Sequence, residues 1–126
     1  MNEKKAINLP GSTTIAPYSP AIEANGFLFV SGQVGFDPIK RCYYGDDIIA
    51  QTRGALNNLK TILEYAGSSM DKIVKTTIFL TDVADFDTVN IIYAEYFKND
   101  PPARSCIQVA ALPKGALMEI EAIALR

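Results

Sequence analysis

The sequence predicts a two-layer α+β domain, in which two helices cover one face of a six-stranded sheet. Six stretches have the alternation or β-branched composition of strands, and two have the apolar spacing of amphipathic helices. Their order along the 126 residues is β-β-β-α-β-α-β-β. Two helices can cover only one face of such a sheet, and this length fits a single domain over residues 1–126.

A hairpin is predicted near the start of the chain. Asn25-Gly26 favours the positive backbone angles of a two-residue turn, and short apolar stretches at 21–24 and 27–30 flank it. A further short strand over residues 4–9 precedes the hairpin and ends at Pro10. These stretches supply the first three strands.

Two loops are predicted around this hairpin. Residues 12–20 are polar, contain prolines and carry Tyr18. Residues 34–46 are expected to be irregular and contain the unusual run Arg41-Cys42-Tyr43-Tyr44.

Two helices and a central strand follow. Residues 47–66 predict a helix capped by Asp46 or Asp47, and residues 85–97 predict a second helix. The apolar residues that recur at helical spacing in the first are Ile49, Leu56, Leu59, Leu63 and Ala66. Residues 73–80 are β-branched and aromatic, as in a central strand.

The last two predicted strands carry the residues best suited to chemistry. In residues 103–111 the odd positions are small or apolar and predict a buried face, while the even positions include Arg104, Cys106 and Gln108. Residues 118–125 place two glutamates, Glu119 and Glu121, on one face of an apolar strand. Buried carboxylates need partners, and Arg104 is the candidate. A structural ion pair and a catalytic arrangement are equally open.

Composition narrows the function. The chain has no histidine, which excludes histidine-based nucleophile activation, acid-base catalysis and metal ligation. Its net charge of -2 gives no basic field for nucleic acid. No apolar run is long enough for a membrane span or a signal peptide, and Cys42 and Cys106 are expected to be free thiols, so we expect a cytoplasmic protein.

Three segments carry a resemblance that extends over nearly the whole chain. They are APYSPAIEANGFLFVSGQ, AGSSMDKIVKTTIFLTDVADFDTVN and PPARSCIQVAALPKGALMEIEAIA. In order and spacing they resemble the RidA family, also called the YjgF or endoribonuclease L-PSP family, of reactive-intermediate (enamine/imine) deaminases. The resemblance implies a chorismate-mutase-like fold and a homotrimer with clefts between subunits. The residues alone predict a homo-oligomer without specifying the number of subunits, because no helix of the chain is left to cover the second face of the sheet. The run 41–44 departs from the family pattern.

The resemblance also implies an activity and a site. The activity is hydrolytic deamination of 2-aminoacrylate, 2-iminopropanoate and 2-iminobutanoate to 2-keto acids and ammonia, without a metal or organic cofactor. The implied site residues are Tyr18, Ser31, Gly32, Asn90, Arg104, Cys106 and Glu119. Arg104 is expected to grip the substrate carboxylate and Glu119 to move protons, while the others line the pocket. Whether Glu121 shares the acid-base role is open.

Other functions remain open at this point. One is a ribonuclease or translation inhibitor, which the acidic composition and missing histidine disfavour. Another is a non-catalytic sensor or chaperone that binds keto acids in the same pocket. Covalent catalysis by Cys106 is disfavoured, because without histidine only Arg104 is available to activate the thiol.

Overall fold

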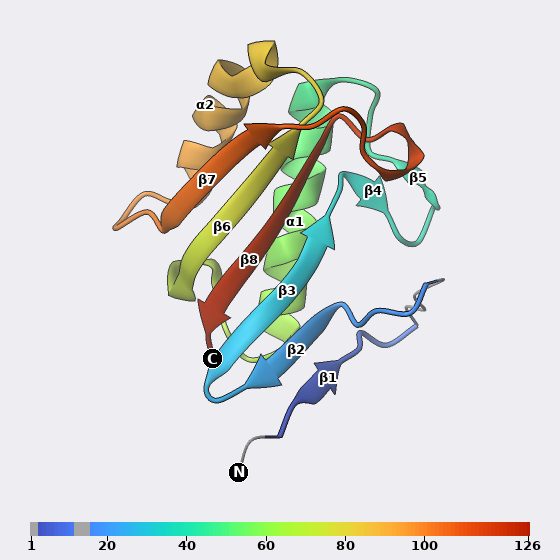
Figure 1. Ribbon diagram of the computed structural model, residues 1–126. Coiled ribbons are helices and arrows are strands. Elements are labelled where there is room, and N and C mark those ends of the chain that lie inside the picture. The colour runs from blue at the N-terminus through green and yellow to red at the C-terminus, as the bar shows by residue number, and fades with distance from the viewer. Residues whose placement is uncertain (1–2, 12–15) are drawn as a thin grey trace.

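The structure is a computed structural model that describes residues 3–11 and 16–126. A mixed sheet of six strands runs through it in the order β1-β2-β3-β8-β6-β7 (Figure 1). The strands are β1 (Lys5–Ile7), β2 (Ala21–Ala24), β3 (Phe27–Gln33), β6 (Ile73–Leu80), β7 (Ala103–Gln108) and β8 (Met118–Leu125). Only β6 and β7 pair in parallel among these strands, because α2 carries the chain from one to the other.

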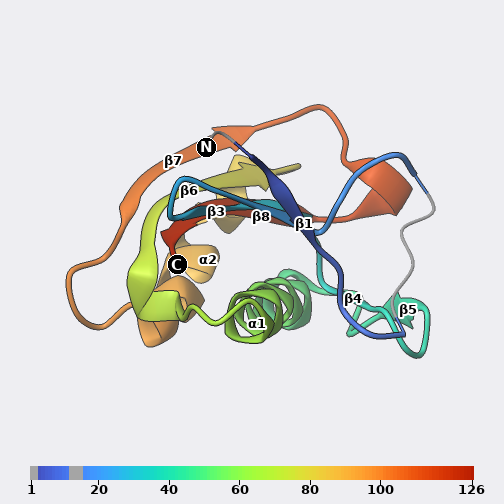
Figure 2. The same ribbon diagram turned by 90° about the horizontal axis from the view of Figure 1, so that it is seen from below.

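Both helices, α1 (Ile48–Tyr65) and α2 (Phe86–Tyr96), lie on the same side of the sheet (Figure 2). The carboxylate of Asp47 accepts a hydrogen bond of 2.8 Å from the N–H of Ala50 and caps α1 as predicted. Three short 3-10 turns lie at Met70–Lys72, Val83–Asp85 and Pro113–Gly115. The predicted two-layer α+β architecture is confirmed. No helix in the described ranges is long and apolar enough to cross a membrane.

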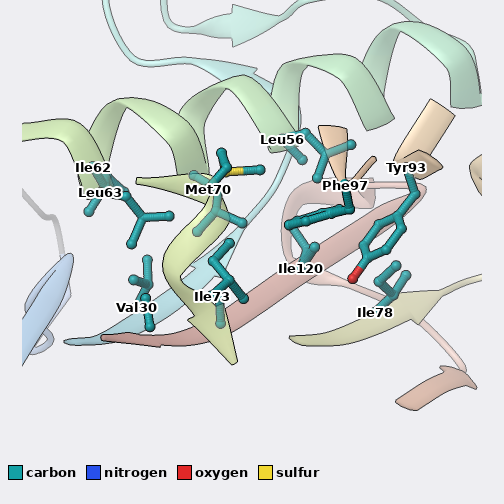
Figure 3. Close-up of a cluster of buried hydrophobic side chains, with 14 of the residues drawn as sticks. Val30, Leu56, Ile62, Leu63, Met70, Ile73, Ile78, Tyr93, Phe97 and Ile120 are labelled. Carbon is teal, nitrogen blue, oxygen red and sulfur yellow. The ribbon is translucent and has the colours of Figure 1, made fainter. Parts of the chain in front are cut away.

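The core lies between the helices and the inner face of the sheet (Figure 3). Alternate residues of β8 are buried there as predicted, and they are Met118, Ile120, Ala122 and Ala124. They face the predicted stripe of α1, of which Leu56, Leu59 and Leu63 are fully buried. Ile49, which the spacing also assigned to that stripe, is 50% exposed, because its neighbour Ile48 takes the position that packs against the core.

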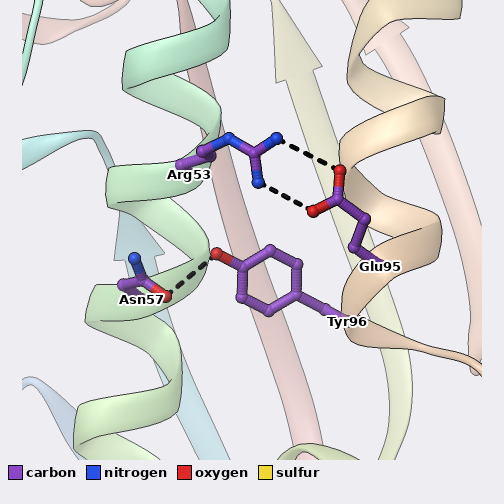
Figure 4. Close-up of polar contacts among 4 residues, drawn as sticks. All are labelled: Arg53, Asn57, Glu95 and Tyr96. Carbon is purple, nitrogen blue, oxygen red and sulfur yellow. Dashed lines mark hydrogen bonds and ion pairs between the residues drawn. The ribbon is translucent and has the colours of Figure 1, made fainter.

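Polar contacts between exposed side chains join the two helices (Figure 4). Arg53 of α1 donates two hydrogen bonds, of 2.8 and 3.1 Å, to the carboxylate of Glu95 in α2. The hydroxyl of Tyr96 donates to Oδ1 of Asn57 at 2.9 Å. Exposed ion pairs add little stability, but this two-pronged geometry fixes how α2 lies beside α1.

The segment predicted to be irregular contains a small hairpin. Its strands are β4 (Phe36–Asp37) and β5 (Cys42–Tyr43), and the rings of Phe36 and Tyr43 meet edge to face at 5.5 Å. The carboxylate of Asp37 accepts hydrogen bonds from the N–H groups of Ile39 and Lys40 and closes the turn. The prediction missed this hairpin because a carboxylate shapes its turn, without the Asn-Gly signal found at residues 25–26.

The predicted orientation of β7 is wrong for the single chain. Its odd residues Ala103, Ser105 and Ile107 are exposed, whereas Arg104 and Cys106 are half-buried on the helix side. The reason is the parallel register with β6, which pairs Arg104 with Thr76 and Cys106 with Ile78, both fully buried. The last two strands are not neighbours, because β6 lies between β7 and β8.

The outer face of the sheet carries no helix within the described residues (Figure 2). Large apolar side chains on it are 38 to 49% exposed, and they are Phe27, Phe29, Ile107 and Leu125. The prediction of an uncovered apolar sheet face is confirmed.

Candidate active site

Arg104 lies against two aromatic rings at the β7 edge of the sheet. Its guanidinium carbon lies 4.8 Å from the ring centroid of Tyr93 and 5.6 Å from that of Phe86, both in α2. A hydrogen bond of 2.8 Å between the hydroxyls of Tyr93 and Thr76 fixes the nearer ring. No carboxylate in the described part of the chain pairs with Arg104. A ring does not accept the N–H donors of a guanidinium as a carboxylate would, so these donors remain available to a ligand.

Asn90 shares a helix face with the two rings, and Cys106 lies two residues from Arg104 on the same face of β7. Phe86, Asn90 and Tyr93 are spaced by four and three residues, so they share the face of α2 that meets Arg104. Burial raises the pKa of the Cys106 thiol above its ordinary value, although the nearby Arg104 acts in the opposite direction. A thiol with a raised pKa stays protonated at neutral pH, which disfavours Cys106 as a nucleophile.

Glu119 lies on the outer face of the sheet, opposite Phe79 in β6 and against the backbone of Gly32 in β3. A Cβ atom at Gly32 would lie only 2.7 Å from Cδ of Glu119, so the carboxylate occupies the space that a side chain would need. Burial raises the pKa of Glu119, and the charge of Glu121 raises it further. This carboxyl group is therefore suited to exchanging a proton nearer neutral pH than an ordinary glutamate.

Ser31 ties the loop that carries Tyr18 to the strand that carries Gly32. Its hydroxyl donates to the carbonyl oxygen of Ser19 at 2.6 Å, and its N–H donates to that of Pro20 at 3.0 Å. Tyr18 itself is 54% exposed, and its side chain lines a cavity together with Gly32. In this chain the Ser31 hydroxyl thus donates its hydrogen to a backbone carbonyl oxygen, and only its oxygen is left to accept a hydrogen bond from a ligand.

The predicted site residues therefore form two groups. Asn90, Arg104 and Cys106 lie on the helix side of the sheet, and Gly32 and Glu119 meet on its outer side. The predicted pairing of Arg104 with the glutamates is wrong within one chain, because the sheet separates them. Sequence reasoning also missed the roles of Phe86 and Tyr93, for which the available signal was their helical spacing around Asn90.

Comparison with known proteins identifies the family. The family model described as Endoribonuclease L-PSP matches residues 10–126. The chain belongs to the endoribonuclease L-PSP family. A human relative named 2-iminobutanoate/2-iminopropanoate deaminase is 44% identical over 117 residues, which cover 93% of this chain and 84% of the human protein. A RutC family protein of Pyrococcus horikoshii is 48% identical over 112 residues, 89% of each chain.

Solved structures similar to this chain have the same fold, and one of them is of a putative endoribonuclease L-PSP from Entamoeba histolytica. The structure of E. coli TdcF with bound serine matches with a TM-score of 0.90 at 39% identity, and the match covers 97% of this chain and 98% of that one. The predicted family and fold class are thus confirmed. Members of this family include proteins named as imine deaminases.

Proposed function

We propose that this protein hydrolyses small 2-imino acids, and the 2-enamino acids that tautomerise to them, to 2-keto acids and ammonia. The observation that carries the proposal is Arg104, a guanidinium fixed by two rings and left without a carboxylate partner among the described residues. A planar two-donor group in this state matches the carboxylate of a 2-imino acid. The names of the human and mouse relatives support this substrate class.

The chemistry needs a carboxylate anchor and one group that moves protons. Arg104 holds the substrate carboxylate, and Glu119 accepts a proton from water as the water oxygen adds to the C=N carbon. Glu119 returns this proton to the nitrogen, which gives a carbinolamine. Glu119 then carries the proton of the carbinol O–H to the same nitrogen, so that the C–N bond breaks, ammonia leaves and the carbinol oxygen becomes the ketone of the 2-keto acid. One water is consumed and one ammonia released, so no oxidant or reductant is required.

We further propose that the site lies between copies of the chain in a homotrimer. Arg104 and Glu119 face opposite sides of one sheet, so a second copy is needed to bring the two groups onto one substrate. The exposed apolar side chains of the outer face, among them Phe29 and Ile107, provide a surface for that copy.

The exposed free thiol of Cys42 is in keeping with a reducing cytoplasmic location.

The decisive assay is ammonia release from freshly generated 2-iminobutanoate, with and without the protein. Arg104→Lys should lose most turnover while the fold persists, because a point charge replaces a planar fork. Turnover like that of the wild type in this variant would remove Arg104 from the site. Ligand binding without any ammonia release in the wild type would favour the non-catalytic sensor instead.

Mixing two inactive variants tests the shared site. In a trimer with two Arg104→Ala subunits and one Glu119→Ala subunit, or the reverse, one interface of three keeps both intact residues. Random co-assembly should then restore roughly a quarter of wild-type ammonia release. No recovery in mixed trimers verified by native mass spectrometry would refute a site shared in this way, without touching the proposed chemistry.

A further inference from the structure

Arg41 belongs to the run at residues 41–44, which the proposed reaction does not use, and it lines a cavity beside the candidate site. The cavity has a volume of about 290 Å³ and lies between the β4–β5 hairpin, α1 and the loop of Tyr18. It shares Tyr18 and Gly32 with the proposed site, and the carboxylate of Glu119 touches the backbone of Gly32. A ligand group in this cavity would therefore lie beside Gly32, the residue that Glu119 approaches from the outer face of the sheet.

The charged side chains of the cavity wall are positive. Among the described residues that line it, the charged ones are Arg41 and Lys114, both cations, in a chain with 14 acidic and 12 basic side chains. The rest of the wall combines apolar groups such as Phe36 and Ile62 with the amide of Asn58. A cavity of this size and character suits a small organic anion with a short apolar body.

The backbone holds both cations in an unusual conformation. Arg41 has φ of 59° and Lys114 has φ of 58°, two of only four non-glycine residues with positive φ in the described ranges. Such a conformation costs on the order of 1 kcal/mol at each residue and persists where the surroundings enforce it. Here the Arg41 N–H donates to the carbonyl oxygen of Asp37 at 2.8 Å, and the Tyr43 hydroxyl donates to that of Lys114 at 2.9 Å.

The side chain of Lys114 is also placed by the hairpin. Its Nζ lies 5.3 Å from the ring centroid of Phe36, whose ring packs against Tyr43. The only carboxylate of the hairpin, that of Asp37, is occupied by the N–H groups of its own turn. The hairpin thus positions two cations at the cavity, and among the described residues its carboxylate forms an ion pair with neither of them.

We propose that this cavity binds the carboxylate of a small organic acid, at a distance from the carboxylate that Arg104 holds. This inference rests on the proposed function and extends its substrate class to dicarboxylic 2-imino acids, whose distal carboxylate would reach Arg41 and Lys114. The same chemistry can come from a second source, a separate molecule of a monocarboxylic 2-keto acid. The two sources differ in the number of acid molecules bound per chain and in whether the protein prefers a dicarboxylic acid.

Calorimetric titration with 2-oxoglutarate and 2-oxobutanoate distinguishes these sources. If the cavity takes a distal carboxylate, the wild type binds 2-oxoglutarate more tightly, and Arg41→Gln or Lys114→Gln lowers this preference about tenfold, the size of one charge-assisted hydrogen bond. If the cavity instead takes a separate acid, two molecules of 2-oxobutanoate bind per chain. The double variant Arg41→Gln, Lys114→Gln should then bind only one. Lys40→Gln is the control, because Lys40 is exposed in the same turn and does not line the cavity.

The inference would be overturned if 2-oxoglutarate and 2-oxobutanoate bound with equal affinity and one molecule per chain, and if the Arg41 and Lys114 variants bound them as the wild type does. An equal loss in Lys40→Gln would overturn it as well, because the effect would then come from general surface charge. Should Lys114→Gln fail to fold, Arg41→Gln in the exposed turn carries the test alone. Ammonia release from 2-iminobutanoate by the wild type is scored separately, so failure of the proposed hydrolysis is distinguishable from failure of this subsite.

Discussion

Replacing Gly32 with alanine tests the position of Glu119 with a single added carbon. The new Cβ atom would lie 2.7 Å from Cδ of Glu119 and 2.9 and 3.0 Å from its two oxygens. Carbon atoms in contact prefer a separation of about 3.5 to 4.0 Å, so the carboxylate must retreat by roughly 1 Å. The backbone at Gly32 is not in the left-handed region, so alanine adds no backbone strain there.

The expected result is a loss of activity with little loss of stability. A flexible side chain gives way easily, so the free energy of unfolding should change little. A misplacement of about 1 Å in a catalytic group can lower the rate about 10²-fold, and kcat/KM for 2-iminobutanoate should fall by that order. The measurements are steady-state ammonia release and thermal unfolding on the same preparation.

Gly35→Ala is the matched control, because its Cβ atom would meet backbone. That atom would lie 2.4 Å from the carbonyl oxygen of Gln51 in α1, which cannot yield without moving the helix. Gly35→Ala should therefore destabilise the fold, whereas Gly32→Ala should not. A Gly32→Ala protein with wild-type kcat/KM would refute the claim that Glu119 acts from its position against this glycine.

Three further substitutions should shift the free energy of unfolding or the pH profile of activity in a definite direction. Thr52 buries a hydroxyl with no partner among the described residues, so Thr52→Val should raise the free energy of unfolding by about 1 kcal/mol in a denaturant titration. Thr76→Val, which leaves the buried Tyr93 hydroxyl without its partner, should lower it by about 1 to 3 kcal/mol. Because the pKa of Glu119 is raised in the fold, its contribution to stability is present below the ordinary glutamate pKa and is lost as pH rises through the raised value. Glu121→Gln removes a charge that raises the pKa of Glu119, so the acidic limb of the kcat/KM profile should move to lower pH. A lower stability for Thr52→Val, an unchanged one for Thr76→Val or an unmoved limb would contradict the respective reasoning.

The parts of the fold that were predictable depend on neighbours in sequence. The turn at Asn25-Gly26 has the positive φ values, 52° and 81°, that its residue types favour. The cap of α1 at Asp47 and the alternation of β8 are likewise local, since a side chain and a backbone group a few residues apart decide them. The ring pocket of Arg104 was not predictable in this way, because the aromatic partners come from α2 and only the β6–α2–β7 crossover brings them to β7.

The misassigned faces of β7 bear on the assembly. Alternation in this strand shows that one face is apolar, but the side on which the helices pack is decided by the register with β6. In the chain alone that apolar face is outward, and Ile107 is 49% exposed. Fully burying such a side chain is worth about 1.5 to 3 kcal/mol relative to leaving it exposed, and Phe29 of β3 on the same outer face is 44% exposed. The homotrimer proposed above would cover this apolar face with another copy of the chain and would bring Arg104 and Glu119 onto one substrate.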